Sequence, residues 1–393
     1  MSDDGQIRVV FFHISHDSFG GGSQMLLRLL KNLDTERFDP IVLAQYEDEF
    51  CKRAQRHKIP VRIVPFRGIL DSYNKSLLDQ PTYKLPLLGL RIGQFVLSAR
   101  SLLSSADVIW CQNIRALLTI LPYVLFSRTP TIWNIGLGER STGLMRRLNS
   151  IALFASDYVF IESEAQAMDV FSDRQLSRYK EKFVIFYKGI DTEEFKPSSD
   201  DANGSEVFRV GTAALLVPRK GLDQFIDCAE QIIERRSDVH FYIAGDTPRD
   251  GDSTYERRLR RRVKGAGIED RVHFLGWVEE MPAYLNSLDL FVLPSHNEGI
   301  PGSVREALST GLPVVATDVG GTSEVVINGK TGILVQPGET SELVEAVTHI
   351  LENREVRKEM GARGRDHVTK SFSLKGYVDR YEMFLQRIER SKG

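Results

Sequence analysis

Two glutamates, Glu298 and Glu306, stand eight positions apart in a segment that also contains proline and several glycines. Those glycines and the proline disfavour a helix before about residue 302, so we expect Glu298 in a loop and Glu306 about one turn inside the next helix. Carboxylates placed in this way can bind the hydroxyls of a sugar or ribose, while the free N–H groups of the first helical turn bind a phosphate. Taken alone, the pair is more typical of an acidic helix start, which the helix dipole favours.

Two adjacent cations, Arg219 and Lys220, follow an apolar run at 208–213 and precede a helical pattern that begins at Leu222. In a parallel sheet they would lie over the same strand ends as Glu298. A diphosphate needs positive charge of this kind, particularly when it departs as a leaving group. Because exposed cations are common in loops, a solvated loop is the alternative.

Glycine-rich turns mark two further junctions between a predicted strand and a predicted helix. Gly20, Gly21 and Gly22 follow the first apolar run, and glycine at this position lets a ligand approach the helix N-terminus closely. The pattern is not the G-x-G-x-x-G of dinucleotide-binding proteins, and a flexible turn is the alternative. Gly320 and Gly321 form a similar turn that offers more amides to an anion.

Aspartates also stand at the end of one predicted strand and in the loop that follows it. Asp246 ends the strand, and an Asp-Gly-Asp sequence at 250–252 superficially resembles a motif that binds a metal–nucleotide complex. Proline, glycine and serine surround the second feature, so we interpret it as turn chemistry. We therefore expect no metal site.

Apolar runs alternate with amphipathic helical patterns along most of the chain, which is typical of parallel strands covered by helices on both faces. Strands are predicted at 7–14, 40–45, 61–65, 107–112, 131–135, 157–162, 183–187, 208–213, 239–244, 272–275, 290–294, 314–317 and 332–335. Helices are predicted at 23–33, 49–57, 88–104, 115–126, 143–155, 164–171, 222–235, 255–266, 281–287, 302–310, 322–327, 341–352 and through the tail at 355–389. The pattern predicts an α/β protein with two doubly wound, Rossmann-like domains that face a ligand-binding cleft.

A polar stretch at 197–205 interrupts the alternation and is interpreted as a linker. We expect an N-terminal domain at 1–196, a C-terminal domain at 197–372, and a final helical segment at 373–393 that packs back towards the N-terminal domain. Two domains agree with a length of 393 residues.

The composition is that of a globular protein, and a net charge of −2 gives no global reason to expect nucleic acid. Six cations within 257–264 are interpreted as a solvated helix, with an anionic membrane contact as the alternative. Three isolated cysteines indicate a reducing compartment. Because the chain starts without an apolar signal and has no apolar stretch long enough to span a bilayer, we expect a cytoplasmic protein.

Taken together, the second half of the chain resembles the donor-binding domain of the retaining, GT-B fold glycosyltransferases of family 4 (glycosyl transferases group 1). Eight pieces over about 120 residues carry the resemblance, in the order and spacing of the family. They are Lys220-Gly221, Ala244-Gly245-Asp246, Phe274-Leu275-Gly276, Leu293-Pro294-Ser295, Glu298-Gly299-x-Pro301 with Glu306-Ala307, the run from Gly311 to Thr317, Gly320-Gly321-x-x-Glu324, and Asn328-Gly329-x-x-Gly332. Gly189-Ile190-Asp191 resembles the family's domain junction, and Gly20–Gly22 its N-terminal glycine loop.

The resemblance implies a role for each residue of this candidate site. Glu306 would hold the ribose hydroxyls of the nucleotide, Glu298 would contact the donor hexose, and Lys220, assisted by Arg219, would bind the diphosphate. The other donor-binding candidates are the backbone of Gly299, Ile300, Gly302, Ser303 and Val304, the base-bordering Gly276 and Trp277, and Asp246, Gly21 and Gly22. The family needs no metal or other cofactor, and in a favoured view the departing phosphate accepts the acceptor's proton.

The sequence departs from the family pattern at three places. Leu215 stands where an arginine is common, and Arg219 is the candidate to replace its charge. Histidines that are frequent in the first domain are absent, so Gln112 and Asn134, together with Arg140, become the acceptor-binding candidates. Lys188 stands at a junction position that is often asparagine.

The segment 83–100 mixes apolar residues with cations, which suits either a membrane-surface helix that presents a lipid-linked acceptor or a crossover helix buried against the sheet. We therefore predict a metal-independent, retaining hexosyltransferase. It would transfer sugar from a nucleotide-diphosphate donor, UDP- rather than GDP-linked, to a saccharide or lipid-linked saccharide, either free in the cytoplasm or in peripheral contact with the inner face of the membrane. The alternatives are a sugar-nucleotide epimerase or phosphorylase-like enzyme of the same fold, and a donor-binding partner subunit with weak catalysis.

Overall fold

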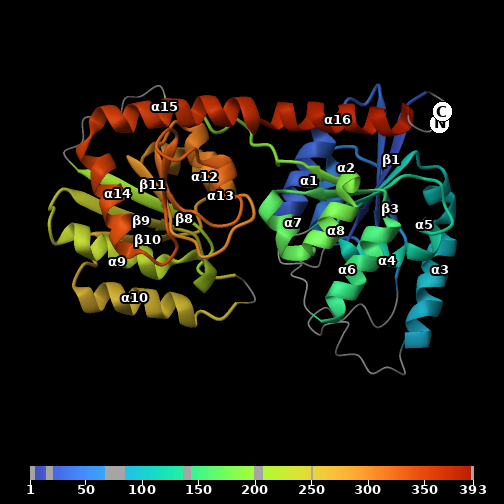
Figure 1. Cartoon of the computed structure of the whole chain (residues 1–393), viewed down its shortest axis with the longest axis horizontal. Coiled ribbons are helices and arrows are strands. Elements are labelled where there is room, and N and C mark those ends of the chain that lie inside the picture. The colour runs from blue at the N-terminus through green and yellow to red at the C-terminus, as the bar shows by residue number, and fades with distance from the viewer. Residues whose placement is uncertain are drawn as a thin grey trace. The chain divides into compact units, whose positions relative to one another are not determined.

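The computed structural model describes residues 5–14, 21–66, 85–135, 143–198, 207–248 and 251–390. The chain divides into two compact units, one formed by residues 1–188 together with 377–393 and the other by residues 189–376 (Figure 1). Each unit has a parallel sheet with helices packed against it, so the predicted α/β class is confirmed. Within the described ranges, no helix is long and apolar enough to cross a membrane.

The first unit contains a seven-stranded parallel sheet in the order β3-β2-β1-β4-β5-β6-β7. Its strands are β1 (Ile7–His13), β2 (Phe38–Ala44), β3 (Val61–Ile63), β4 (Val108–Cys111), β5 (Thr131–Asn134), β6 (Tyr158–Ile161) and β7 (Phe183–Ile185). The strand order reverses between β1 and β4, which pair with each other. Such a reversal opens a crevice at the carboxyl ends of the two strands, where α/β proteins bind ligands.

Helices connect these strands as expected, with two corrections. They are α1 (Gly21–Asn32), α2 (Glu49–Arg56), α3 (Leu85–Ser104), α4 (Ile114–Thr119), α5 (Leu121–Val124), α6 (Leu144–Ala155), α7 (Glu164–Val170) and α8 (Asp173–Arg178). The single helix expected at 115–126 is wrong, because Pro122 lies in the first turn of α5 and cannot continue α4. The sequence analysis also missed α8. Ser172 is the N-cap of this helix and forms a capping box with Gln175.

The second unit contains a six-stranded parallel sheet in the order β10-β9-β8-β11-β12-β13. Its strands are β8 (Phe208–Ala213), β9 (Val239–Ala244), β10 (Val272–Gly276), β11 (Leu290–Leu293), β12 (Val314–Thr317) and β13 (Gly332–Val335). Here the order reverses between β8 and β11, where Val210 pairs with Leu290 and Gly211 with Phe291.

The helices of the second unit are α9 (Leu222–Ile233), α10 (Thr254–Ala266), α11 (Met281–Asn286), α12 (Gly302–Ser309), α13 (Thr322–Val325), α14 (Thr340–Glu352) and α15 (Arg354–Ser371). The tail expected as one helix at 355–389 is in fact two, α15 and α16 (Leu374–Arg390). Backbone hydrogen bonds explain the break between α15 and α16. Ile190 donates to the carbonyl of Phe372 and accepts from the N–H of Leu374, both at 2.7 Å, so these residues bridge to another segment instead of extending α15.

The residues of α16 from Tyr377 onward belong to the first unit. There the Tyr381 ring is buried, with its centroid 6.4 Å from that of Phe11 and 5.7 Å from that of Phe160. Burial of an aromatic side chain of this size anchors the last helix to the sheet.

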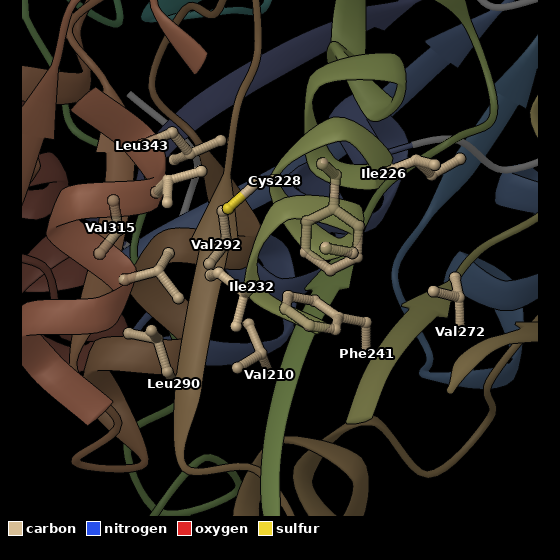
Figure 2. Close-up of a cluster of buried hydrophobic side chains, with 14 of the residues drawn as sticks. Val210, Ile226, Cys228, Ile232, Phe241, Val272, Leu290, Val292, Val315 and Leu343 are labelled. Atoms are coloured by element: carbon tan, nitrogen blue, oxygen red, sulfur yellow. The ribbon is translucent and has the colours of Figure 1, made fainter. Parts of the chain in front are cut away.

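The hydrophobic core of the second unit holds in place the strands whose ends carry the candidate site. Figure 2 shows Val210, Phe241 and Val292 from the strands facing Ile226, Cys228 and Ile232 of α9, with Leu343 of α14 nearby. All of these side chains are buried. Near-continuous apolar strands are typical of a sheet covered on both faces, so the strand ends are held rigidly.

Candidate functional site

The candidate site lies where the strand order of the second unit reverses. Lys220 follows β8 and Glu298 follows β11, and these two strands are neighbours in the sheet. Because all strands are parallel, both loops leave at the same edge. The structure therefore brings together two residues that are 78 positions apart in the chain.

Glu298 is the centre of a charged hydrogen-bond cluster. The ammonium of Lys220 and the hydroxyl of Ser295 both donate to Oε1 of Glu298, at 2.5 and 2.6 Å. The Glu298 side chain is only 7% exposed, and Ser295 is fully buried. A buried carboxylate requires partners of this kind, since its desolvation is costly. The sequence analysis missed both the direct ion pair and the contribution of Ser295.

Arg219 takes a more peripheral place than Lys220. Its guanidinium lies 4.0 Å from Oε2 of Glu298, and its side chain is 52% exposed. Leu215, which stands at the family's arginine position, is also exposed. Arg219 therefore lies near the second oxygen of Glu298 without a close hydrogen bond to it.

Glycines allow the three loops of the site to pack against one another without side chains between them. A Cβ atom on Gly221 would lie 1.8 Å from the carbonyl oxygen of Pro294, and one on Gly320 would lie 1.8 Å from that of Glu298. Both glycines have positive φ, at 63° and 55°. The N–H of Gly321 also donates to the carbonyl of Gly299 at 2.7 Å. These contacts set the position of the Glu298 loop.

The N-terminus of α12 follows this loop directly. Pro301 is its N-cap, with φ −70° and ψ 115°, and Gly302, Ser303 and Val304 form the first turn. N–H groups at this position have no acceptor within their own helix and suit an anion. Ile300 and Val304 are buried, Gly299, Gly302 and Ser303 are half-buried, and Glu306 is a half-buried residue further along the helix.

The remaining donor-binding candidates lie at the ends of β9 and β10. Asp246 is exposed, and its carboxylate accepts from the N–H of Thr247 at 2.8 Å. The N–H of Gly245 donates to the carbonyl of Gly276 at 2.7 Å, which joins the two loops. Trp277 is 68% exposed, so its indole offers a free aromatic face at the sheet edge.

In the first unit, Gln112 and Asn134 meet at the ends of β4 and β5. The side-chain amide of Asn134 donates to the backbone carbonyl of Gln112 at 3.2 Å. Asn113 caps α4 and donates to the carbonyl of Ile14 at 2.8 Å, across the point where the strand order reverses. Arg140 and Gly20 lie outside the described residues, whereas Gly21 and Gly22 form the first turn of α1.

Two further polar pairs in the first unit were not predicted. Nε2 of His13 lies 2.8 Å from a carboxylate oxygen of Asp48, whose other oxygen accepts from the N–H of Cys51 and caps α2. Lys188 forms an ion pair with the buried Glu162. The departure at Lys188 from the family pattern is therefore matched by an acidic partner in the fold.

The cations of α10 are largely paired in a similar way. Arg258 and Arg262 form ion pairs with Asp223 and Asp227 of α9, while Arg260 bonds with Glu256. These contacts agree with a surface helix packed on its neighbour. Among the residues that the structure describes, no group of three or more His, Cys, Asp or Glu side chains is arranged to hold a metal ion.

A family model matches most of the second unit. Residues 207–353 match the family model described as glycosyl transferases group 1. A lipopolysaccharide core biosynthesis mannosyltransferase of Rhizobium meliloti (strain 1021) is 31% identical over 200 residues, which are 49% of this chain and 57% of that protein.

Two other relatives carry lipid acceptors in their names. A GDP-mannose-dependent α-(1-6)-phosphatidylinositol monomannoside mannosyltransferase of Mycobacterium tuberculosis is 32% identical over 199 residues, covering 46% of this chain and 50% of that protein. A UDP-Gal:α-D-GlcNAc-diphosphoundecaprenol α-1,3-galactosyltransferase of Escherichia coli is 28% identical over 209 residues, covering 51% and 52%. The chain thus spans about half the length of the curated relatives it matches.

Solved structures extend the similarity to nearly the whole chain. The Anabaena protein HepE in complex with UDP and glucose has a TM-score of 0.77 and 22% identity, covering 97% of this chain and all of that one. Sucrose-phosphate synthase from Thermosynechococcus elongatus has a TM-score of 0.75 and 17% identity, covering 98% of this chain and all of that one. This likeness shows the GT-B fold.

Proposed function

We propose that this protein is a retaining, metal-independent glycosyltransferase. It transfers a hexose from a nucleotide-diphosphate sugar, with UDP favoured over GDP, to a saccharide or lipid-linked saccharide acceptor. The main observation behind this proposal is the Lys220–Glu298 pair beside the N-terminus of α12. Both lie within the segment that matches the glycosyl transferases group 1 model. Relatives named for GDP-mannose and UDP-galactose support a sugar-nucleotide donor.

The arrangement supplies the chemistry that this transfer needs. The bond between the anomeric carbon and the phosphate oxygen breaks, and the acceptor hydroxyl oxygen bonds to that carbon while its proton passes to the departing phosphate. Lys220 and the first-turn amides of α12 stabilise the negative charge that grows on the leaving diphosphate. Glu298 binds the hexose, and Glu306 binds the ribose.

The Lys220 ammonium donates a hydrogen bond to Glu298. The donor diphosphate competes with that carboxylate for the same ammonium, which has three N–H donors. Donor binding therefore weakens the contact between Lys220 and Glu298 and makes the carboxylate more available for sugar hydroxyls.

A donor-binding experiment tests the proposal. UDP- and GDP-sugars are titrated into the wild type and the Lys220→Ala and Glu306→Ala variants by calorimetry. Loss of one charged hydrogen bond costs about 1.5–3 kcal/mol, so we expect each variant to bind the donor roughly 10- to 100-fold more weakly. Lys264→Ala, at an exposed lysine of α10, is the control and should bind normally.

The outcome separates the proposal from its rivals. Donor affinity that is unchanged in both variants would sink the site assignment. Donor turnover without any acceptor would indicate an epimerase, while tight donor binding without turnover on a broad acceptor panel would indicate a partner subunit.

For the acceptor side, we propose contact with an anionic membrane through α3, α4, α5 and α6, which pack side by side in the first unit (Figure 1). None of these helices contains Asp or Glu. The segment 85–156 is positively charged, because it contains seven arginines and only two acidic residues. Leu97 is 70% and Phe126 91% exposed. Exposed apolar side chains among cations suit a lipid surface, and a lipid-linked acceptor would be delivered there. Gln112, Asn134 and Arg140 remain the proposed acceptor-binding residues.

A further inference from the structure

A cavity of about 510 Å³ lies in the second unit between α15 and the loop that joins α13 to β13. Its lining includes Ile327, Lys330, Thr331, Arg363, His367 and Lys370. The volume suits a small molecule. Because the loop precedes β13, the cavity lies towards the amino ends of the parallel strands, whereas Lys220 and Glu298 lie at the carboxyl ends. It is therefore separate from the candidate donor site.

The charge of the lining favours an anion. Three cations, Lys330, Arg363 and Lys370, face one lining carboxylate, Asp366. Asp366 pairs with Lys370 at 2.7 Å, and Arg363 pairs with Glu359, which is not part of the lining, at 2.9 Å. Both are exposed pairs on the surface of one helix, and such pairs are weak. A phosphate can therefore replace the carboxylates as the partner of Arg363 and Lys370. Lys330, which is exposed on the loop, adds a further positive charge.

Hydroxyl-binding groups accompany the cations. The ring of His367 bonds to the backbone of Val325, whereas its Nε2 atom is buried and has no hydrogen-bond partner among the described residues. Burial lowers the pKa of His367, although Asp366 and the Val325 bond oppose this effect, and the lowered pKa favours the neutral ring, which can accept a hydrogen bond. Thr331 accepts from the N–H of Ile327 at 2.8 Å, which leaves its own O–H able to donate.

We propose that this cavity binds a small molecule that carries both a phosphate group and hydroxyl groups, such as a sugar phosphate. The phosphate contacts Lys330, Arg363 and Lys370. The ligand hydroxyls lie near His367 and Thr331 of the lining, and the apolar side of the ligand lies on Ile327. The proposal does not rest on the glycosyltransferase assignment, because none of these residues belongs to the donor site.

Glucose 6-phosphate, titrated into the full chain by calorimetry, tests the inference. We expect saturable binding to the wild type, and at least tenfold weaker binding to Lys330→Glu and Arg363→Glu. Lys358→Glu makes the same charge change at an exposed lysine of α15 outside the lining, and should bind as the wild type does. Lys220→Ala should also retain binding, and glucose without phosphate should not compete. Circular dichroism confirms that each variant is folded.

Three results would overturn the inference. The first is the absence of any binding to the folded wild type. The second is binding that disappears in Lys220→Ala but persists in Lys330→Glu, since the ligand would then occupy the donor site. The third is recognition of a lipid headgroup instead of a free molecule. In that case glucose 6-phosphate does not bind, the wild type binds phosphatidylcholine–phosphatidic acid vesicles, and Lys330→Glu abolishes the vesicle binding.

Discussion

At the scale of single residues, Glu298 has a position determined by its neighbours. Lys220 and Ser295 share one carboxylate oxygen, and the hydroxyl of Thr317 in turn donates to the backbone carbonyl of Ser295. Ser295 therefore acts as a positioning residue: it orients Glu298 and leaves its second oxygen directed to other partners. Ser295 and Thr317 both lie in pieces that carry the family resemblance, but the sequence analysis gave neither a role, because a hydroxyl gives no charge pattern.

Replacing Ser295 by Ala should impair turnover more than donor affinity. The Lys220 pair remains, but Glu298 loses one of its two donors, so we expect kcat to fall about tenfold, equivalent to roughly 1.4 kcal/mol. Steady-state kinetics with the donor at varied concentration measures the change. Ser309→Ala is the control, because Ser309 is equally buried and its hydroxyl donates to the carbonyl of Phe195. A normal kcat in Ser295→Ala would contradict the positioning role.

Asp48 should make the stability of the first unit depend on pH. Burial raises the pKa of Asp48, but the hydrogen bond and charge of His13 and the N–H of Cys51 outweigh it, so the net pKa is lowered. A carboxyl with a lowered folded-state pKa stabilises the protein above its unfolded pKa, near 3.8, and loses this contribution as pH falls through the folded value. Urea unfolding should therefore show a deficit in Asp48→Asn at neutral pH that shrinks below about pH 4. A deficit of constant size would argue against the linkage.

At the scale of elements, α15 packs so closely on the turn after α12 that only glycine fits at the contact. A Cβ atom on Gly361 would lie 2.0 Å from the carbonyl oxygen of Gly311. Gly361→Ala should therefore destabilise the second unit, by about 1–3 kcal/mol as for other overpacked sites. Gly265 in α10 has open space around its Cβ position, so Gly265→Ala should be neutral or stabilise by up to about 1 kcal/mol. Thermal unfolding of the two variants compares them, and equal shifts in Tm would refute the close contact.

The elements themselves were largely predictable, whereas the contacts between their loops were not. Strands such as β8 and β9 were predicted to the residue, because an uninterrupted apolar run has one interpretation in a doubly wound sheet. The joint between α4 and α5 was missed, since the pattern of buried residues continues across it. The Lys220–Glu298 pair depends on how glycine-containing loops stack, and no local pattern encodes that stacking.

At the scale of the whole molecule, the net charge of −2 conceals an uneven distribution. The arginine-rich segment 85–156 should carry the contact with anionic lipid. We expect the double variant Leu97→Ala and Phe126→Ala to bind phosphatidylcholine–phosphatidylglycerol vesicles about tenfold more weakly in a sedimentation assay, because two exposed apolar side chains no longer enter the interface. Added salt should also weaken binding of the wild type.

Met383→Ala provides the control for this experiment. Met383 is an exposed apolar residue of α16, outside the segment 85–156, so its loss should leave vesicle binding unchanged. Equal losses in the two proteins would point to nonspecific adsorption, and binding that does not respond to salt would exclude a contribution from the arginines.

The ion pair between Lys220 and Glu298 also bears on how quickly the spent nucleotide leaves. In the proposed reaction, a nucleoside diphosphate still contacts Lys220 after the sugar has been transferred, and the nearby carboxylate competes with it for the same ammonium. An internal competitor shortens the residence of the product without requiring any large movement of the chain. We therefore expect Glu298→Gln to retain UDP longer than the wild type in a stopped-flow release measurement. The same glutamate would then serve both to hold the incoming sugar and to clear the site for the next one.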